Sequence, residues 1–270
     1  MPTISVQNLT KEYHIYKKEE GLTGAIKSFF KRTYETKTAV EKISFDIEQG
    51  ELIGFIGPNG AGKTTTLKML SGLLYPTSGS ISVLNHTPFN RKPAFLKQIS
   101  LVMGQKNQLW WDLPPMDTFL LNKEIYEIPD RDFQQRVEEL SELLDVKDIL
   151  HVQVRKLSLG QRMKCELMAA LLHQPKILFL DEPTIGLDVV VQHKLRSFIK
   201  EYNRKYNATI LLTSHYMRDV KQLCDRVIVI NFGRIIYDGN LDKLMEKYAT
   251  KGKSDIEDVI RKFFSDTQHA

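Results

Sequence analysis

The sequence predicts an α/β fold in which a parallel β-sheet carries an inserted set of helices. Three continuous apolar runs are typical of strands in a parallel sheet that is buried on both faces. They are Lys176–Leu180, Ala208–Leu212 and Arg226–Ile230. A glycine-rich segment, Gly57–Thr64, follows another apolar run and precedes a helical pattern. Between that segment and the three runs, apolar residues recur at helical spacing, which indicates a helical insertion in an α/β core.

The residues before position 105 are expected to form mostly strands. Alternation of apolar and polar residues predicts the first strand, and the turn Gln49-Gly50 separates the next two. A helix should follow the glycine-rich segment and end before Pro76. The expected strands are Ile4–Leu9, Ala39–Ile47, Glu51–Ile56, Gly79–Leu84 and Leu101–Met103, and the expected helix is Lys63–Leu74.

A helical subdomain is expected over about residues 106–173. Asp117–Ile128 and Asp130–Leu144 have apolar residues at helical spacing, and the aspartate at the start of each is the predicted N-cap. A third helix is expected from Ser158 to His173. Residues 241–270 should form a helical tail, with helices at Leu241–Tyr248 and Asp255–Phe264.

Composition excludes some classes of protein. The 270 residues are 42% hydrophobic and 26% charged, which is ordinary for a soluble globular chain. The net charge of +5 is mild, so no nucleic-acid partner is expected. No apolar run reaches the roughly 18 residues that span a bilayer, so the chain should be cytosolic. Cys165 and Cys224 lack zinc-site spacing and are expected to be small buried side chains.

The segment 57–64 fits the pattern G-x-x-x-x-G-K-[ST]. Glycines allow backbone N–H groups to close around phosphate oxygens, and the following helix directs its positive end at the same anion. Lys63 supplies a positive charge to the β- and γ-phosphates, and the hydroxyl of Thr64 is a ligand for Mg²⁺. Binding and hydrolysis of Mg²⁺-ATP are therefore expected here, with contacts from Gly57, Pro58, Asn59, Gly60, Ala61, Gly62, Lys63, Thr64 and Thr65.

Two acidic residues, Asp181 and Glu182, end an apolar strand. Asp181 is expected to bind Mg²⁺, and Glu182 is the expected general base that polarises the attacking water. The alternative is that both carboxylates only cap the following helix. A further anion-binding segment is Leu157–Gln161, because it joins a serine hydroxyl, a glycine and a helix start. Taken alone, that segment could equally be an ordinary N-cap.

In this order the motifs resemble those of the nucleotide-binding subunit of an ATP-binding-cassette (ABC) transporter. The resemblance covers Ile4–Gly239 and implies a P-loop NTPase (RecA-like) core, an antiparallel β subdomain and an α-helical subdomain, with residues 1–240 as the ATPase domain. The matching motifs are Gly57–Thr64 as Walker A, Gln105 as the Q-loop, Leu157–Gln161 as the signature, Ile177–Glu182 as Walker B, Ile185–Asp188 as the D-loop and His215 as the switch histidine.

The resemblance implies that two cassettes, most simply two copies of this chain, dimerise head to tail. Each ATP then lies between one subunit's Walker A and the other's signature. It implies that Gln105 is a metal-sensing residue and that Gln105, Glu182 and His215 form the catalytic set. Transmembrane permease chains would be the partners, which places the chain at the cytoplasmic face of the membrane. The residues expected to contact ATP across the dimer are Ser158, Gly160, Gln161 and Asp188.

Departures from the family pattern are small. Leu159 stands where glycine is common, and Gly186 stands where alanine is frequent. In cassettes an aromatic residue after the first strand stacks on adenine, and Tyr13 is the best match, with Tyr16 the second choice. The segment 14–38 is longer than usual, so it is an insertion.

Within the insertion, one helical face is expected to gather Leu22, Ile26, Phe29 and Phe30. Its helix could pack on its own domain or contact the membrane partner. The pair Trp110-Trp111 could likewise be buried in the core or lie near the groove for the permease.

Several short stretches of the sequence resemble those of a bacterial exporter-type subgroup, in which the permeases are separate chains. An importer subunit is the second reading. A soluble cassette ATPase acting on DNA or ribosomes is less favoured, because there is one cassette and neither a long coiled coil nor zinc spacing. A simple kinase or GTPase is disfavoured by the signature and by the missing Asn-Lys-x-Asp motif.

Overall fold

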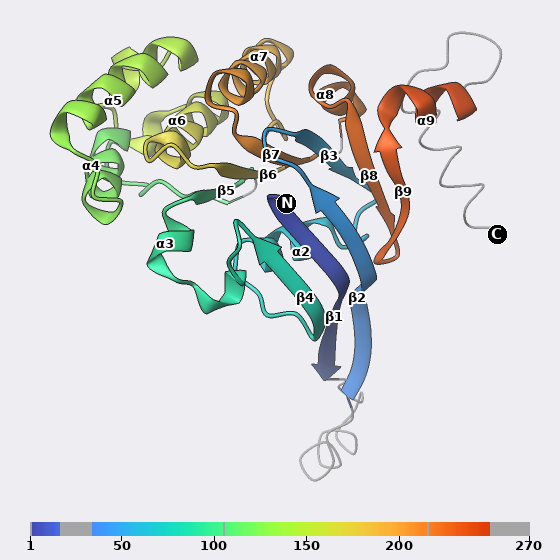
Figure 1. Ribbon diagram of the computed structural model, residues 1–270. Coiled ribbons are helices and arrows are strands. Elements are labelled where there is room, and N and C mark those ends of the chain that lie inside the picture. Colours follow the sequence, from blue (N-terminus) through green and yellow to red (C-terminus); the bar gives the residue numbers. More distant parts are fainter. Residues whose placement is uncertain (1, 17–33, 105, 215, 249–270) are drawn as a thin grey trace, which may run out of the picture.

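The computed structural model describes residues 2–16, 34–104, 106–214 and 216–248. Two sheets and a group of helices make up this part of the chain (Figure 1). The strands are β1 (Ile4–Tyr16), β2 (Tyr34–Ile47), β3 (Leu52–Ile56), β4 (Ser78–Val83), β5 (Ile99–Met103), β6 (Ile177–Asp181), β7 (Thr209–Thr213), β8 (Arg226–Asn231) and β9 (Arg234–Asn240). The helices are α2 (Lys63–Leu70), α3 (Pro93–Leu96), α4 (Pro115–Ile125), α5 (Asp130–Leu144), α6 (Leu159–Leu171), α7 (Val189–Tyr206), α8 (Met217–Leu223) and α9 (Leu241–Tyr248).

The larger sheet has the strand order β5-β6-β7-β3-β8-β9. Every neighbouring pair from β5 to β8 is parallel, and β9 pairs antiparallel with β8. The three apolar runs in the sequence form β6, β7 and β8, so the prediction of a parallel sheet is confirmed. Parallel pairing brings the carboxyl ends of β3, β5, β6 and β7 to one edge.

Alternate side chains of this sheet enter two different cores. In β6, Ile177 and Phe179 pack on one face, and Leu178 and Leu180 pack on the other. The first face is covered by α2 and the smaller sheet, because their apolar residues share a cluster with Phe179. The second face is covered by residues of α4 to α9 (Figure 1). Burial on both faces explains why the strands are continuously apolar.

The smaller sheet is antiparallel, in the order β2-β1-β4. Both β1 and β2 are longer than the sequence predicts, because their pairing continues to Tyr16 opposite Tyr34. The pairing of β1 with β4 ends at Ser78, opposite Thr10. Beyond that pair, β1 and β2 continue as a two-stranded ribbon, which holds both ends of the predicted insertion 14–38. The expected helical face at Leu22–Phe30 lies outside the described residues.

The predicted N-caps at Asp117 and Asp130 are wrong. The N-cap residues of α4 and α5 are Pro114 and Pro129, and both aspartates lie inside the first helical turn. Proline suits a helix start because its missing N–H has no helical partner there, and a first-turn carboxylate still favours the helix dipole. Aspartate therefore marks these helix starts without capping them.

Other boundaries differ by a few residues, and several elements have no counterpart in the sequence predictions. Helix α2 ends at Leu70, before the expected Leu74, since the chain turns at Gly72 with φ of 74°. The expected tail helix Leu241–Tyr248 is present as α9, whereas Asp255–Phe264 lies outside the described residues. The elements that were not predicted are α3, α7, α8 and β9.

Cys165 and Cys224 are both buried and free, as expected. Burial raises the pKa of the Cys165 thiol to about 12, so the side chain behaves as an apolar group. Within the described ranges, no helix is both long and apolar enough to cross a lipid bilayer.

Candidate functional site

The phosphate-loop residues and the two acidic residues meet at the carboxyl edge of the larger sheet. β3 ends at Ile56, just before the loop, and β6 ends at Asp181. Asp181 lies beside Thr213 of β7 on one side and Met103 of β5 on the other. Strand register alone therefore places the ends of four separate chain segments together.

The loop 57–62 folds tightly against its surroundings. Gly62 is the N-cap of α2 and has a φ of 111°, which L side chains rarely adopt. A Cβ atom there would lie 2.5 Å from the carbonyl oxygen of Ala39. One cavity of about 270 Å³ is lined by Ala39, Glu182 and the loop residues Asn59, Gly60, Ala61, Gly62, Lys63, Thr64 and Thr65. The loop thus has the form of an anion-binding cradle at a helix start.

Lys63 lies under this cradle. Its Nζ donates to the carbonyl oxygens of Gly57, at 2.7 Å, and Pro58, at 3.0 Å. Burial lowers the pKa of the Lys63 ammonium, while the nearby Glu182 and Asp181 carboxylates oppose that shift. The side chain is therefore a buried donor held at the loop by two backbone acceptors.

Asp181 joins helix α2 to two strands. Its carboxylate accepts hydrogen bonds from Thr64 Oγ1, at 2.8 and 3.1 Å, and from Thr213 Oγ1, at 2.6 Å. A hydroxyl and a carboxylate this close are the oxygen ligands that Mg²⁺ prefers. The two predicted metal ligands Thr64 and Asp181 therefore fit a magnesium ion.

Glu182 adopts a left-handed backbone conformation, with a φ of 55°. Its N–H is bonded to both the carbonyl oxygen and Oγ1 of Thr213, each at 3.1 Å. Glu182 lines the cavity at the phosphate loop. It also lines a second cavity, which Thr64 and Asp181 border as well. Glu182 is thereby placed between the phosphate cradle and the metal-ligand pair.

Gln105 and His215 lie outside the described residues, so their predicted roles stay predictions. Their chain neighbours are at the same edge: Gly104 N–H donates to the carbonyl oxygen of Asp181 at 2.8 Å. On the other side of the site, Ser214 follows the last residue of β7.

The signature residues begin α6. Ser158 is its N-cap, and a capping box is present in which Ser158 Oγ accepts from the N–H of Gln161 while the Gln161 side chain accepts from the N–H of Ser158. A Cβ atom on Gly160 would lie 3.1 Å from Val191 of α7, so the helix start packs closely on α7. Neither of the two cavities that Glu182 lines includes any of residues 158–161. Within this chain the signature residues therefore lie apart from the two cavities at the phosphate loop.

Asp188 is the N-cap of α7, where one carboxylate oxygen accepts from the N–H groups of Val190 and Val191 at 3.0 Å. Val189 and Val190 are exposed beside it. The residue predicted to act across a dimer therefore also has a local capping role.

Tyr13 lies in the ribbon, opposite Lys37 of β2. Lys37 is two residues from Ala39 of β2, whose carbonyl borders Gly62, so Tyr13 lies on the strand next to the one that borders the phosphate loop. Its ring is exposed and has Lys11 Nζ 5.3 Å from the centroid. Tyr16, the second choice for the adenine contact, is three residues farther along the ribbon and packs edge-on against Tyr34.

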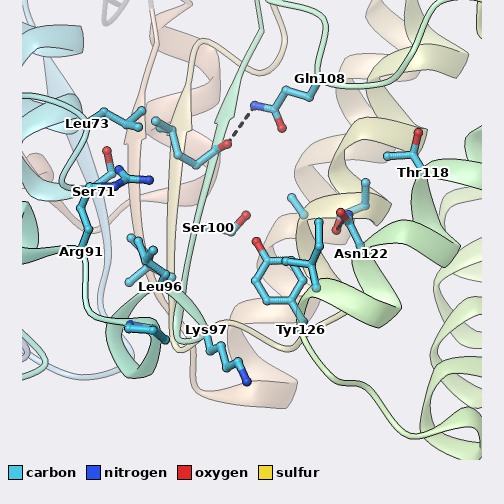
Figure 2. Close-up of a pocket in the computed structure, with 16 residues that line it drawn as sticks. Ser71, Leu73, Arg91, Leu96, Lys97, Ser100, Gln108, Thr118, Asn122 and Tyr126 are labelled. Carbon is cyan, nitrogen blue, oxygen red and sulfur yellow. Dashed lines mark hydrogen bonds between the residues drawn. The ribbon is translucent and has the colours of Figure 1, made fainter.

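A larger cleft of about 490 Å³ lies between the α/β core and the helices α4 and α6. In Figure 2, Ser71, Leu73 and Arg91 lie on one side and Thr118, Asn122 and Tyr126 on the other.

Trp110 and Trp111 lie in the segment between β5 and α4 and are 57% and 49% exposed. The alternative that they are buried in the core is wrong.

Glu166 of α6 is a residue that the sequence patterns did not single out. Its side chain is 1% exposed and contacts Arg162 Nε at 3.7 Å and the N–H of Gln108 at 3.4 Å. Burial raises the pKa of the Glu166 carboxyl to about 7, against the lowering effect of Gln108 and Arg162. Arg162 in turn lies over the ring of Trp111, 5.8 Å from its centroid. The i,i+4 pair Arg162–Glu166 within a mostly buried helix is the signal that could have identified it.

Comparison with known proteins gives a family and several relatives. Residues 40–185 match the family model described as ABC transporter. The ABC transporter ATP-binding protein NatA of Bacillus subtilis (strain 168) is 37% identical over 77% of this chain and 84% of its own. The bacitracin transport ATP-binding protein BcrA of Bacillus licheniformis is 32% identical, over 80% of this chain and 69% of its own. The daunorubicin resistance ATP-binding protein DrrA3 of Streptomyces coeruleorubidus is 35% identical, over 85% of this chain and 71% of its own.

Solved structures share the fold. An ATP-binding subunit of an ABC transporter superposes with a TM-score of 0.77, covering 97% of this chain and 99% of its own at 23% identity. An ATP-binding cassette solved as a dimer in a post-hydrolysis state with ADP and Pi has a TM-score of 0.73 at 22% identity. The match covers 88% of this chain and 98% of that structure's chain. The fold predicted from the motifs is therefore confirmed.

The Lys63→Ala variant should bind ATP at least about tenfold more weakly, because one charge-assisted hydrogen bond contributes about 1.5–3 kcal/mol. A binding titration with ATP measures the affinity. Lys200→Ala, which changes an exposed lysine of α7, is the control and should keep the wild-type affinity. Equal affinities in the two variants would refute a phosphate-binding role for Lys63.

The Glu166→Gln variant should gain stability over the wild type as pH rises. The folded-state pKa is raised from 4.5 to about 7, so the wild-type carboxyl favours folding below pH 4.5 and loses that contribution between pH 4.5 and 7. The neutral amide does not titrate, and the difference in unfolding free energy should reach on the order of 2 kcal/mol at pH 8. Urea unfolding at pH 5 and pH 8 measures it. Glu201→Gln, at an exposed position of α7, serves as the control, and a difference that does not change with pH would contradict the burial argument.

Proposed function

The chain belongs to the ABC transporter family, and from that premise we propose that it is the ATP-hydrolysing motor subunit of an exporter, acting as a head-to-tail dimer beneath separate permease chains. It is an ATP-binding cassette ATPase by family. The direction of transport, the dimer and the partners are parts of the proposal.

One observation carries the catalytic part of the proposal. The Thr64–Asp181 pair lies beside Glu182 and Lys63 at the sheet edge. The expected metal ligands, the expected base and the lysine that binds phosphate therefore lie around adjoining cavities. Thr64 and Asp181 would hold Mg²⁺, and the predicted Gln105 would complete its contacts. When bound, the ion neutralises charge on the phosphate oxygens.

In this proposal Glu182 accepts a proton from the attacking water, and its backbone is fixed by Thr213. Lys63 and the loop N–H groups hold the phosphates, which keeps the γ-phosphate in line with that water. His215 contacts the γ-phosphate and helps align Glu182. Tyr13 stacks on the adenine from the ribbon.

The second half of the ATP site comes from another copy of this chain. Ser158 is exposed at the positive end of α6, where it can donate to a phosphate of a neighbouring subunit. Asp188 is also exposed, and the exposed Val189 and Val190 beside it add apolar area. Gln161 is half-buried, and Gly160 is buried against Val191 just behind Ser158. Closure of the dimer would therefore gate hydrolysis.

The large cleft is the proposed docking site of the permease (Figure 2). Its lining joins the core to α4 and α6, so a helix bound there would contact both. The segment that follows Gln105 enters this cleft, since Gln108 donates from its side chain to the carbonyl oxygen of Leu101 at 2.9 Å. Docking would hold the chain at the cytoplasmic face of the membrane as a peripheral subunit, with no nucleic-acid partner.

Export is favoured by the names of the relatives, one of which concerns bacitracin transport and another daunorubicin resistance. An importer subunit is the second candidate. A soluble cassette ATPase remains the third, and the docking experiment below separates it from the other two.

The Glu182→Gln variant should keep ATP binding and accumulate a nucleotide-bound dimer, because the amide cannot accept the proton of the attacking water. Its turnover should fall by about two to four orders of magnitude. Phosphate release and size-exclusion chromatography with ATP measure both effects. Turnover within a few-fold of wild type would mean that Glu182 is not the base.

A charge placed in the cleft should release the chain from the membrane. Leu73→Asp and Ile125→Asp each change an exposed apolar side chain that lines the cleft. Burying an unpaired carboxylate there should lower the membrane-bound fraction of tagged protein by about tenfold or more, while ATP binding stays unchanged. Leu143→Asp, at an exposed apolar position of α5, is the control. Retention of both cleft variants on washed membranes would refute this docking site.

A further inference from the structure

Asp219 of α8 is a buried carboxylate at which three chain segments meet. Its side chain is 1% exposed. Oδ2 accepts hydrogen bonds from Thr184 Oγ1 and from Ser214 Oγ, the latter at 3.0 Å. Oδ1 accepts from the guanidinium of Arg196 in α7 at 2.6 Å.

The three donors come from segments that border the catalytic edge. Thr184 is two residues after Glu182, in the turn that leads to Asp188 and α7. Ser214 directly follows β7, whose Thr213 bonds to Asp181 and to the N–H of Glu182. Arg196 lies on α7. One carboxylate therefore ties the segment after Glu182 to the segment after β7.

Ser214 also fixes the backbone on both sides of position 215. Its Oγ accepts from the N–H of Tyr216 at 2.9 Å while it bonds to Asp219. Removing the Ser214 hydroxyl would therefore release the backbone N–H of Tyr216 as well as the end of β7.

A carboxylate suits this position better than any neutral side chain. It has two acceptor oxygens and no proton, whereas an asparagine would offer one acceptor oxygen and two donors. The buried positive charge of Arg196 is compensated by the same group, so removal of either charge leaves the other uncompensated. Thr184, Ser214 and Arg196 are all buried with Asp219, which keeps the network out of contact with bulk water.

We infer that Asp219 is a positioning residue for ATP hydrolysis: it sets the spacing between the segment that bears Glu182 and the end of β7, where Thr213 and Ser214 lie. The inference rests on the proposed role of Glu182. Asp219 touches neither nucleotide cavity, so its effect passes through Thr184 and Ser214.

The test removes the two hydroxyl donors and leaves the buried ion pair intact. Thr184→Val and Ser214→Ala should each lower kcat for ATP hydrolysis by about tenfold, which corresponds to about 1.4 kcal/mol of misalignment in the transition state. The affinity for ATP, measured by titration, should stay within about twofold, because the phosphate loop does not contact the network. Thr184→Ser keeps the hydroxyl and should restore most of the turnover.

Two buried hydroxyls elsewhere provide matched controls. Thr209→Val acts at the other end of β7, where Thr209 Oγ1 accepts from the N–H of Gly50 at 3.0 Å. Ser141→Ala removes a hydroxyl that bonds to the carbonyl of Glu138 in α5 at 2.9 Å. Both should lower the melting temperature about as much as the test variants and leave kcat unchanged.

A double variant tests whether the two donors act through one group. If both work through Asp219, the Thr184→Val/Ser214→Ala protein should lose about as much turnover as the worse single variant. Losses that multiply would show independent effects and overturn the inference. So would a wild-type kcat in both folded single variants, or a kcat that falls only in parallel with ATP affinity.

Glu182→Gln in the same assay keeps the two proposals apart. If it abolishes turnover while Thr184→Val and Ser214→Ala do not change it, only the role of Asp219 fails. If Glu182→Gln retains turnover, the assignment of the base fails. Asp219 could then not act by placing that base, so the inference would be overturned with it.

Discussion

The carboxylate of Asp181 accepts hydrogen bonds from Thr64 at the head of α2 and from Thr213 at the end of β7. Because Thr213 also binds the N–H of Glu182, one pair of side chains fixes the helix that follows the phosphate loop, two strands and the proposed base. The strands can meet in this way only because they are parallel neighbours that end at the same edge. Parallel pairing of β6 and β7 is thus the constraint from which the rest of the site follows.

The parts of the fold that local chemistry specifies were accessible from the sequence. Residues 57–64 and Asp181-Glu182 are contiguous motifs, and their strands are continuously apolar because both faces are covered. Helix α7 was not predicted. It begins with three valines, two of them highly exposed, and its buried residues all lie between Leu195 and Tyr202 within 18 residues of mostly polar sequence. The N-cap residues of α4 and α5 also differed from the predicted aspartates. Proline fixes the start of each helix, and a nearby aspartate does not indicate which residue is the cap.

Features that depend on distant residues could not be found in the sequence. Asp219 meets Thr184 and Arg196 only after α7 and α8 pack together, and no spacing rule joins the three positions. The exposure of Trp110 and Trp111 depends on the path of the chain between β5 and α4. The signature residues were recognised by resemblance, and their distance from the phosphate loop of the same chain follows from α6 lying with the helices over the opposite core.

The ribbon formed by the far ends of β1 and β2 has a consequence for assembly. Beyond Ser78, β4 no longer pairs with β1 in the part of the chain that the structure describes, so β1 changes from a central strand to an edge strand. Edge strands invite pairing with other chains, and charged side chains along them discourage it. Lys11, Glu12 and the exposed His14 lie on this edge, and the Thr77 hydroxyl accepts from the N–H of Glu12 in place of a strand partner. Replacing these polar residues by apolar ones would therefore favour aggregation through the ribbon.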